Sequence, residues 1–220
     1  MRVALVTGAS RGIGKDIADL LEINGIKVIR PSRSELDLSS KESLLNFCNS
    51  FNWEIDILIN NAGINPIRNI EEIDLEVMQE IYTVNTFAPM LLMKYASKYM
   101  QKNKYGRIVN ISSIWSCVSK PGRMLYAGSK AAINAITTTA AIELGSDNIL
   151  VNAVAPGFVD TELTRKNNSP EDIEKILSNI PLNKMASVDN IAELVWFLCS
   201  DKNQYITGQT ILIDGGFTCR

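Results

Sequence analysis

The sequence predicts an α/β fold in which buried parallel strands alternate with helices. The chain opens with the apolar, β-branched run Val3–Val6, which has the composition of a strand buried on both faces. A glycine-rich turn follows it, and apolar residues then recur at helical spacing up to a stop at Asn24-Gly25. Further strands are expected at residues 26–29, 35–38, 55–59, 108–111, 149–154 and 210–213, and further helices at 41–51, 87–100, 127–144 and 188–198.

Length and composition favour one soluble globular domain. The 220 residues suffice for a single sizeable core, and no boundary, repeat or low-complexity linker divides residues 1–220. A formal net charge of −2 gives no electrostatic reason to expect nucleic acid or an anionic membrane as a partner. No apolar run approaches the roughly 18 residues of a membrane span. No signal peptide precedes the first strand, so a cytoplasmic location is expected.

The absence of histidine restricts the chemistry that the chain can perform. It excludes a serine–histidine triad and any metal site built on histidine. The cysteines at positions 48, 117, 199 and 219 are scattered without metal-ligand spacing, and they fit reduced thiols. No metal is therefore expected, and a catalytic base must be Tyr, Lys, Asp, Glu or Cys.

The first candidate site is the glycine-rich turn after the first strand. It contains Gly8, Gly12 and Gly14 in the pattern T-G-x-x-x-G-x-G, which differs from the common G-x-G-x-x-G spacing. A strand, a glycine turn and a helix in succession aim backbone N–H groups and a helix N-terminus at a phosphate. The turn therefore predicts a nucleotide site.

The second candidate site is a tyrosine–lysine pair, Tyr126 and Lys130. On a helix their side chains lie one turn apart on the same face. A nearby ammonium lowers the pKa of a phenol from its usual value of about 10, as general acid–base work near neutrality requires. Ser113 follows the expected strand at 108–111, and ligands of an open parallel sheet bind at such carboxyl ends. Taken alone, Tyr-x-x-x-Lys is more typical of a chance pair on a solvated helix, and the accompanying motifs change that interpretation.

These motifs together resemble the short-chain dehydrogenase/reductases. The matching segments are the glycine turn, N-N-A-G at 60–63, V-N-T around Asn85, N-I-S-S at 110–113, Y-A-G-S-K at 126–130 and P-G-x-x-x-T at 156–161. The resemblance covers the whole chain and implies a doubly wound parallel sheet with helices on both faces, the Rossmann fold. One departure is expected: the helix between strands 2 and 3 is predicted to be deleted, which leaves the adenine pocket more open.

The resemblance also implies a reaction, hydride transfer between a nicotinamide and a carbonyl or secondary alcohol. Tyr126 would give its proton to the carbonyl oxygen, and Ser113 would donate a hydrogen bond to the same atom. Lys130 would lower the tyrosine pKa and hold the nicotinamide ribose, and the backbone carbonyl of Asn85 would hold a relay water. The implied cofactor-binding residues are Gly8, Ser10, Arg11, Gly12, Ile13, Gly14, Ser32, Arg33, Asp37, Leu38, Asn61, Ala62, Gly63, Tyr126, Lys130, Pro156, Gly157, Val159 and Thr161.

The end of the second strand indicates which nicotinamide cofactor binds. Ser32 stands where NAD-preferring relatives carry an acidic residue, and Arg33 follows it. An arginine suits a 2′-phosphate, and Arg11 could supply a second positive charge. NADP(H) is therefore preferred and NAD(H) remains possible, because Glu35 could reach the ribose instead.

The substrate is less constrained. The carboxyl-terminal stretch, from Y-I-T-G at 205–208 to D-G-G at 214–216, resembles the 3-oxoacyl-[acyl-carrier-protein] reductases. These enzymes dock an acidic carrier on two basic residues, but the aligned positions here are Lys104 and Asp147, and the aspartate would repel such a carrier. A sugar, polyol or other small alcohol is therefore an alternative substrate. A non-catalytic nucleotide-binding regulator is a third interpretation, against which the intact motif residues argue.

Two longer segments suggest further features of the molecule. Residues 87–100 and 127–144 are too apolar to face water along two sides, which predicts a homodimer or a homotetramer. The polar segment 164–184 is expected to be mobile and to act as a lid over the substrate.

Overall fold

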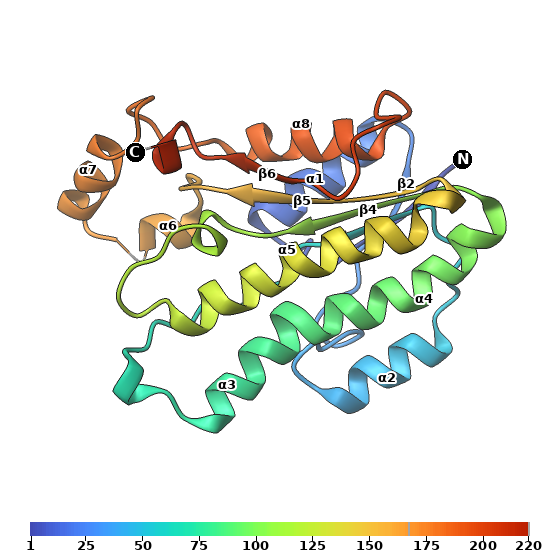
Figure 1. Ribbon diagram of the computed structural model, residues 1–220, viewed down its shortest axis with the longest axis horizontal. Helices are drawn as coiled ribbons and strands as arrows, with labels where there is room; N and C mark the ends of the chain where they lie inside the picture. The colour runs from blue at the N-terminus through green and yellow to red at the C-terminus, as the bar shows by residue number, and fades with distance from the viewer. Residues whose placement is uncertain (167, 220) are drawn as a thin grey trace.

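Six parallel strands form the sheet that the rest of the chain covers (Figure 1). The computed structural model describes residues 1–166 and 168–219. The strand order is β2 (Lys27–Ile29), β1 (Val3–Val6), β3 (Ile57–Asn60), β4 (Gly106–Ile111), β5 (Ile149–Pro156) and β6 (Thr210–Ile213). The order reverses at β1, so the carboxyl ends of β1 and β3 flank the crevice in which such sheets bind ligands. The predicted doubly wound fold is confirmed.

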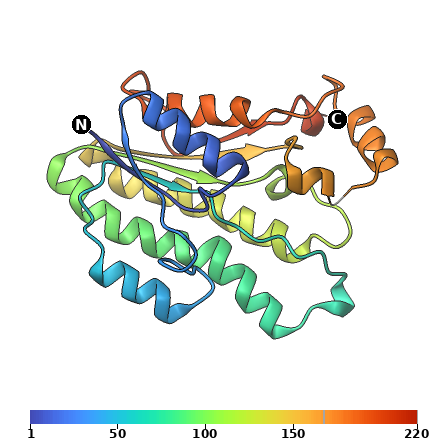
Figure 2. The same cartoon turned by 180° about the vertical axis from the view of Figure 1, so that it is seen from behind.

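Helices cover both faces of the sheet (Figures 1 and 2). The helices α1 (Gly12–Ile23) and α8 (Val188–Cys199) pack side by side on one face. The other face carries α4 (Ala88–Asn103) and α5 (Met124–Leu144), with α2 (Lys41–Ser50) packed against α4. The remaining short elements are η1 (Ile70–Glu72), α3 (Leu75–Tyr82), η2 (Thr83–Phe87), η3 (Ile114–Ser116), η4 (Gly145–Asp147), α6 (Glu162–Lys166), α7 (Pro170–Ser178) and η5 (Phe217–Cys219).

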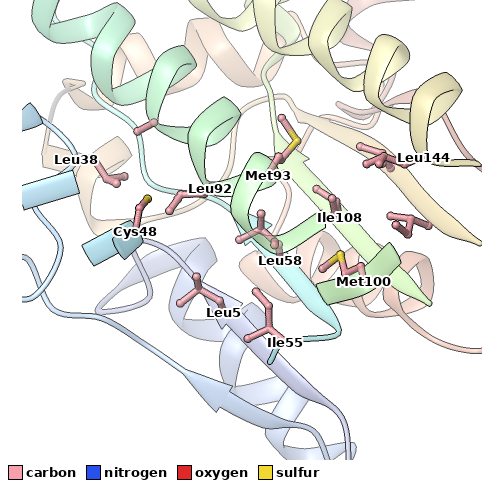
Figure 3. Packing of buried hydrophobic residues seen from close by; sticks show 14 of the residues in the cluster. Leu5, Leu38, Cys48, Ile55, Leu58, Leu92, Met93, Met100, Ile108 and Leu144 are labelled. Atoms are coloured by element: carbon pink, nitrogen blue, oxygen red, sulfur yellow. The ribbon is translucent and has the colours of Figure 1, made fainter. Parts of the chain in front are cut away.

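The apolar strands supply a core to each layer because successive side chains point to opposite faces of a sheet. Leu5, Leu58 and Ile108 belong to the cluster under α2, α4 and α5, which Figure 3 shows. The residues next to them in sequence, Val6, Ile59 and Val109, belong to the cluster under α1 and α8. This double burial explains why β3, β4 and β5 are almost continuously apolar.

The predicted strand at residues 35–38 is wrong. This segment forms turns, and β2 is the edge of the sheet. The Ser32 carbonyl accepts hydrogen bonds from the N–H groups of both Glu35 and Leu36, which closes the chain on itself. Leu36 and Leu38 are buried in the cluster near α2, so the apolar–polar alternation that resembles a strand anchors a loop instead. The helix that was predicted to be missing is the one that would precede residue 35. It is absent, since no described residue between β2 and α2 is helical.

The helix expected at 87–100 starts earlier than predicted. Helical residues run without a break from α3 through the π turn η2 into α4, which ends at Lys104 in the left-handed conformation (φ 52°). The polar segment 164–184 contains parts of α6 and all of α7, with Asn167 outside the described residues. Among the described residues, no helix combines the length and the apolar composition that crossing a membrane requires.

Candidate active site

The carboxyl ends of the central strands meet along one edge of the sheet. The register pairs Val6 of β1 with Ile59 of β3, and Asn60 of β3 with Asn110 of β4. Pro156, the last residue of β5, is likewise level with the end of β6. The segments that leave these ends are the predicted motifs at 7–14, 61–63, 112–116 and 157–161. The topology therefore gathers motifs that are up to 150 residues apart in sequence.

Asn61 holds the glycine turn against the end of β3. Its side-chain Nδ2 donates to the carbonyl oxygens of Thr7 (3.0 Å) and Gly8 (3.1 Å). In return, the Thr7 hydroxyl accepts from the N–H groups of Asn61 and Ala62, at 3.1 Å each. A side chain at Gly14 would meet the Asn61 amide at 2.3 Å, so only glycine permits this approach. The two predicted motifs are thus one interlocked unit.

The turn itself leaves the N-terminus of α1 open. Gly8 and Gly12 have positive φ angles of 65° and 55°, which favour glycine. Arg11 occupies the N-cap position, and no side chain caps the first N–H groups of α1. Ser10 and Arg11 are exposed and Ile13 is half-buried at this end. Free N–H groups at a helix N-terminus are the arrangement that binds phosphate.

Ser113, Tyr126 and Lys130 come together at the end of β4, as predicted. Ser113 is buried, and its hydroxyl accepts a hydrogen bond from the Trp115 N–H at 3.2 Å. The Ser113 side chain lies close enough to Tyr126 to lower the pKa of its hydroxyl. One turn further along α5, Lys130 Nζ lies 5.7 Å from the centre of the Tyr126 ring and donates to the Ile111 carbonyl at 2.7 Å. The helical spacing of the pair therefore does place both groups beside the serine.

The electrostatics of the pair differ from the expectation. Burial lowers the pKa of Lys130 to about 8. Burial also raises the pKa of Tyr126, and the smaller opposing effects come from the Ser113 hydrogen bond and the Arg123 charge. The sequence predicted a tyrosine pKa lowered by Lys130. Desolvation outweighs such an effect in this structure, and the cation that lowers the tyrosine pKa is Arg123.

Asn85 lies in the π turn η2 and reaches the same site. Its Oδ1 accepts from the Ile64 N–H at 2.9 Å, and its Nδ2 donates to the Ile64 carbonyl at 2.9 Å and to the Ser129 hydroxyl at 3.1 Å. A Cβ on Gly63 would lie 3.2 Å from Asn85 Oδ1 and 3.5 Å from Lys130 Nζ. Gly63 therefore leaves a small space that the asparagine and the lysine border together.

The segment after β5 lies across the crevice from the glycine turn. Gly157 approaches Asp214 so closely that an added Cβ would lie 2.8 Å from the aspartate Cα. Val159 is buried, and the Thr161 methyl group lies 4.0 Å from the position of a Cβ on Gly12. The P-G-x-x-x-T motif thus faces the glycine turn across the crevice.

In the loop after β2, Glu35 and Arg33 each interact with another residue of the same loop. The Ser32 N–H and hydroxyl both donate to the Glu35 carboxylate at 2.7 Å. Arg33 is 81% exposed and forms a long ion pair, 3.5 Å, with Asp37. Asp37 is half-buried, whereas Leu38 is buried in the core cluster and presents its side chain to α2 and α4 rather than to solvent.

A cavity of about 550 Å³ adjoins the site, and sequence reasoning did not find its walls. Trp115, Phe158 and Phe217 form one wall through edge-to-face contacts, with ring centres 5.3 to 6.3 Å apart. Lys175, Ile176 and Asn179 from and after α7 line the cavity as well. The segment predicted as a lid therefore provides one side of this cavity. Trp115 could have been suspected because it lies two residues after Ser113.

Comparison with known proteins places the chain in a family. The family model described as "Enoyl-(Acyl carrier protein) reductase" matches residues 34–218. The 3-oxoacyl-[acyl-carrier-protein] reductase of Escherichia coli (strain K12) is 35% identical over 98% of this chain and 96% of its own length. The same enzyme of Rickettsia felis is 38% identical over 98% of this chain and 96% of its own. The chain belongs to the short-chain dehydrogenase/reductase family.

Solved structures of short-chain dehydrogenases share the fold over its full length. A 4-hydroxyisoleucine dehydrogenase complexed with NADH superimposes with a TM-score of 0.94, at 29% identity and 100% coverage of both chains. An NADPH-dependent reductase involved in bacilysin biosynthesis superimposes with a TM-score of 0.87, at 27% identity over 99% of this chain and 98% of the other. This short-chain dehydrogenase is thus an oxidoreductase that acts on a CH–OH or carbonyl group and is similar to the 3-oxoacyl-[acyl-carrier-protein] reductases.

Two surface residues, at the positions that the sequence suggested for carrier docking, carry opposite charges. Lys104 forms an ion pair with Asp147, whose carboxylate also accepts a hydrogen bond from Gln101 at 3.0 Å. The two positions at which carrier-docking relatives are basic therefore neutralise each other in this short-chain dehydrogenase. An acidic carrier would find no net positive charge there.

Proposed function

We propose that this chain transfers hydride between a nicotinamide cofactor and a carbonyl or secondary alcohol, with Tyr126 as the proton donor. The observation that carries the proposal is the convergence of three side chains at the carboxyl end of β4. Ser113 lies close enough to Tyr126 to lower its pKa, and Lys130 lies one helical turn away with Nζ 5.7 Å from the centre of the Tyr126 ring. The bound nicotinamide would supply the hydride, and the protein would supply orientation and the proton.

Ser113 is suited to stabilise the carbonyl oxygen as negative charge develops on it. Its hydroxyl oxygen already accepts the Trp115 N–H, so its own proton is available for donation. Tyr126 would donate to the same oxygen and then transfer its proton. Removing one such donor from an enzyme commonly costs about 2.7–4 kcal/mol of transition-state stabilisation.

Lys130 and Asn85 would restore the proton to Tyr126. Lys130 has a pKa lowered to about 8 by burial, so it exchanges protons readily near neutral pH. The space at Gly63 is bordered by Lys130 Nζ and Asn85 Oδ1, and it is suited to a ribose hydroxyl or a relay water. The π turn at Asn85 supports the relay water, because a π turn interrupts the regular helical hydrogen bonding of the backbone carbonyls.

The substitution Tyr126→Phe tests the central role directly. It removes the proton donor but keeps the ring, so turnover should fall by about 10²- to 10⁴-fold while cofactor affinity stays within about twofold. Tyr95→Phe is the matched control, since Tyr95 on α4 bonds Asn49 far from the site. Initial rates and cofactor titrations of both variants give the comparison. Retention of more than a few per cent of the activity in Tyr126→Phe would remove Tyr126 from its role.

The finer proposal concerns the cofactor, which we assign as NADP(H). Arg11 at the N-cap of α1 and Arg33 after β2 are both exposed near the end of β2, where a 2′-phosphate would lie. The pair between Arg33 and Asp37 is long and exposed, so releasing Arg33 toward a phosphate costs little. The Glu35 carboxylate is occupied by the Ser32 N–H and hydroxyl, which supports a structural role in the turn.

One observation favours NAD(H) instead. The Glu35 carboxylate lies directly at Ser32, the position of the acidic residue in NAD-preferring relatives. A carboxylate there accepts hydrogen bonds from ribose hydroxyls and repels a 2′-phosphate. Solved relatives include one complexed with NADH and one described as NADPH-dependent, so both cofactors occur on this fold.

Titration of both cofactors by intrinsic fluorescence decides between them. If the assignment is correct, the unmutated protein binds NADPH more tightly than NADH, and Arg33→Ala raises the NADPH dissociation constant about ten- to a hundredfold. The same substitution should hardly affect NADH. Lys41→Ala serves as a control for the loss of an exposed charge nearby. Tighter binding of NADH by the unmutated protein would overturn the assignment and point to Glu35.

We also propose that the chain forms a homodimer or a dimer of dimers through α4 and α5. Met90 on α4 and Ile142 on α5 are exposed to 46% and 78%, which is costly for apolar side chains on neighbouring helices. A groove lined by residues of both helices, among them Met90, Met93, Ile136 and Ala140, runs between them. A symmetric pairing of this face would bury these side chains.

Light scattering at micromolar concentration tests the assembly. The unmutated protein should have twice or four times the chain mass, and Met90→Glu should shift it toward the monomer by burying a charge in the interface. Ile23→Glu is the matched control, because Ile23 is 81% exposed on α1 on the other face of the sheet. A monomeric unmutated protein, or an equal shift in both variants, would contradict the proposal.

A further inference from the structure

We infer that Arg123 is an anchor for a carboxylate of the substrate, so that the substrate is a compact oxo or hydroxy acid. This inference rests on the proposed function, because it names the substrate class of the same site. Arg123 occupies the N-cap position of α5, three residues before Tyr126, and is half-buried. The two residues stand three positions apart at the start of α5, so their side chains lie on the same side of the helix, and the charge of Arg123 lowers the pKa of Tyr126.

The guanidinium is held in place but lacks a counter-ion. Nη1 donates to Asn65 Oδ1 at 2.6 Å, and Cζ lies 5.7 Å from the centre of the Trp115 ring. Nε is buried and makes no hydrogen bond to any described residue. In the described part of the chain, no carboxylate pairs with Arg123. Burial lowers the pKa of Arg123, which means that its charge is held at a cost.

A second cation shares the same ring. Lys120 Nζ lies 5.4 Å from the centre of Trp115, and its pKa is lowered by partial burial and then by the charge of Arg123. The charge of Asp172 on α7 acts in the opposite direction, but it makes no ion pair with Lys120. Two cations that repel each other beside one aromatic ring would be stabilised by an anion bound near both.

Two other arginines of this edge already have carboxylate partners. Arg165 forms a two-pronged ion pair with Asp160, at 2.5 and 2.6 Å, and Arg33 pairs with Asp37. Arg123 therefore differs from them in having donor atoms without a partner. A guanidinium with an unpaired donor and no counter-ion matches a carboxylate, which accepts charge-assisted N–H bonds.

The position of Arg123 limits the length of the substrate. Residues three apart on a helix have Cβ atoms about 5–6 Å apart, so Arg123 and Tyr126 reach points within a few bonds of each other. A carbonyl at Tyr126 and a carboxylate at Arg123 thus belong to the same small molecule. The apolar part of that molecule would lie against Trp115, Phe158 and Phe217. A thioester on a carrier has no carboxylate to offer at that place.

Matched pairs of oxo acids and their methyl esters test the anchor. With 2-, 3- and 4-oxo acids of four to six carbons, the unmutated protein should prefer the best acid to its ester in kcat/KM by about ten- to a hundredfold. Arg123→Gln should bring this ratio close to one, mainly by raising KM for the acid, and Arg123→Lys should restore part of it. Arg68→Gln, at an exposed arginine whose guanidinium donates to the Ile67 carbonyl, should keep the full preference.

The outcomes separate this inference from the proposed function. If esters are turned over as well as acids, or if Arg123→Gln keeps the preference, the anchor is wrong while the reductase activity stands. If nothing is turned over, ligand-observed NMR with 3-hydroxybutanoate and its methyl ester tests binding alone. The acid should bind the unmutated protein and not Arg123→Gln. Equal binding of both compounds, or no binding of the acid, would overturn the anchor.

Discussion

The buried ammonium of Lys130 is the constraint on which the arrangement of the site depends. Lys130 is 4% exposed, and its Nζ donates to the carbonyl oxygen of Ile111, which is the last residue of β4. The helix α5 packs on β5 and on η3, the turn that follows β4, and this packing brings Lys130 to the end of β4 and Tyr126 close to Ser113. A Cβ at Gly63 would crowd Asn85 Oδ1 at 3.2 Å and fill the space beside Lys130 Nζ at 3.5 Å. The cost of burying a charge therefore fixes the positions of the helix, the strand end and the neighbouring loop.

The site contains two cations, Lys130 and Arg123, that have different surroundings. Lys130 is enclosed, and its lowered pKa suits proton exchange near neutrality. Arg123 is half-buried against Trp115, remains charged at any ordinary pH, and acts on Tyr126 through space. The same guanidinium can then favour proton release from the tyrosine and attract an anionic substrate. By contrast, Lys104 and Asp147 cancel each other, which reduces the attraction for an acidic carrier.

The sequence predicted the fold and the convergence of the motifs because both depend on local pattern. Apolar runs buried on both faces specify parallel strands, and the four-residue spacing of Tyr126 and Lys130 specifies one helix face. The strand at 35–38 failed because alternation also suits a loop that buries Leu36 and Leu38. The sign of the Tyr126 pKa shift and the role of Arg123 depend on burial and on missing partners. Neither can be predicted from the sequence around Arg123, because Pro121-Gly122 before it indicates only a turn.

The central claim is that this chain moves a hydride directly between a nicotinamide and a carbon atom. The most direct measurement uses NADPH or NADH carrying deuterium at C4 on one face of the ring, together with a panel of carbonyl compounds. Mass spectrometry and NMR of the product then locate the label. We expect the deuterated face of one cofactor to deliver its label to the carbinol carbon, with a proton from solvent on the oxygen. A product without label from either face of either cofactor, or no reduction across the panel, would contradict it.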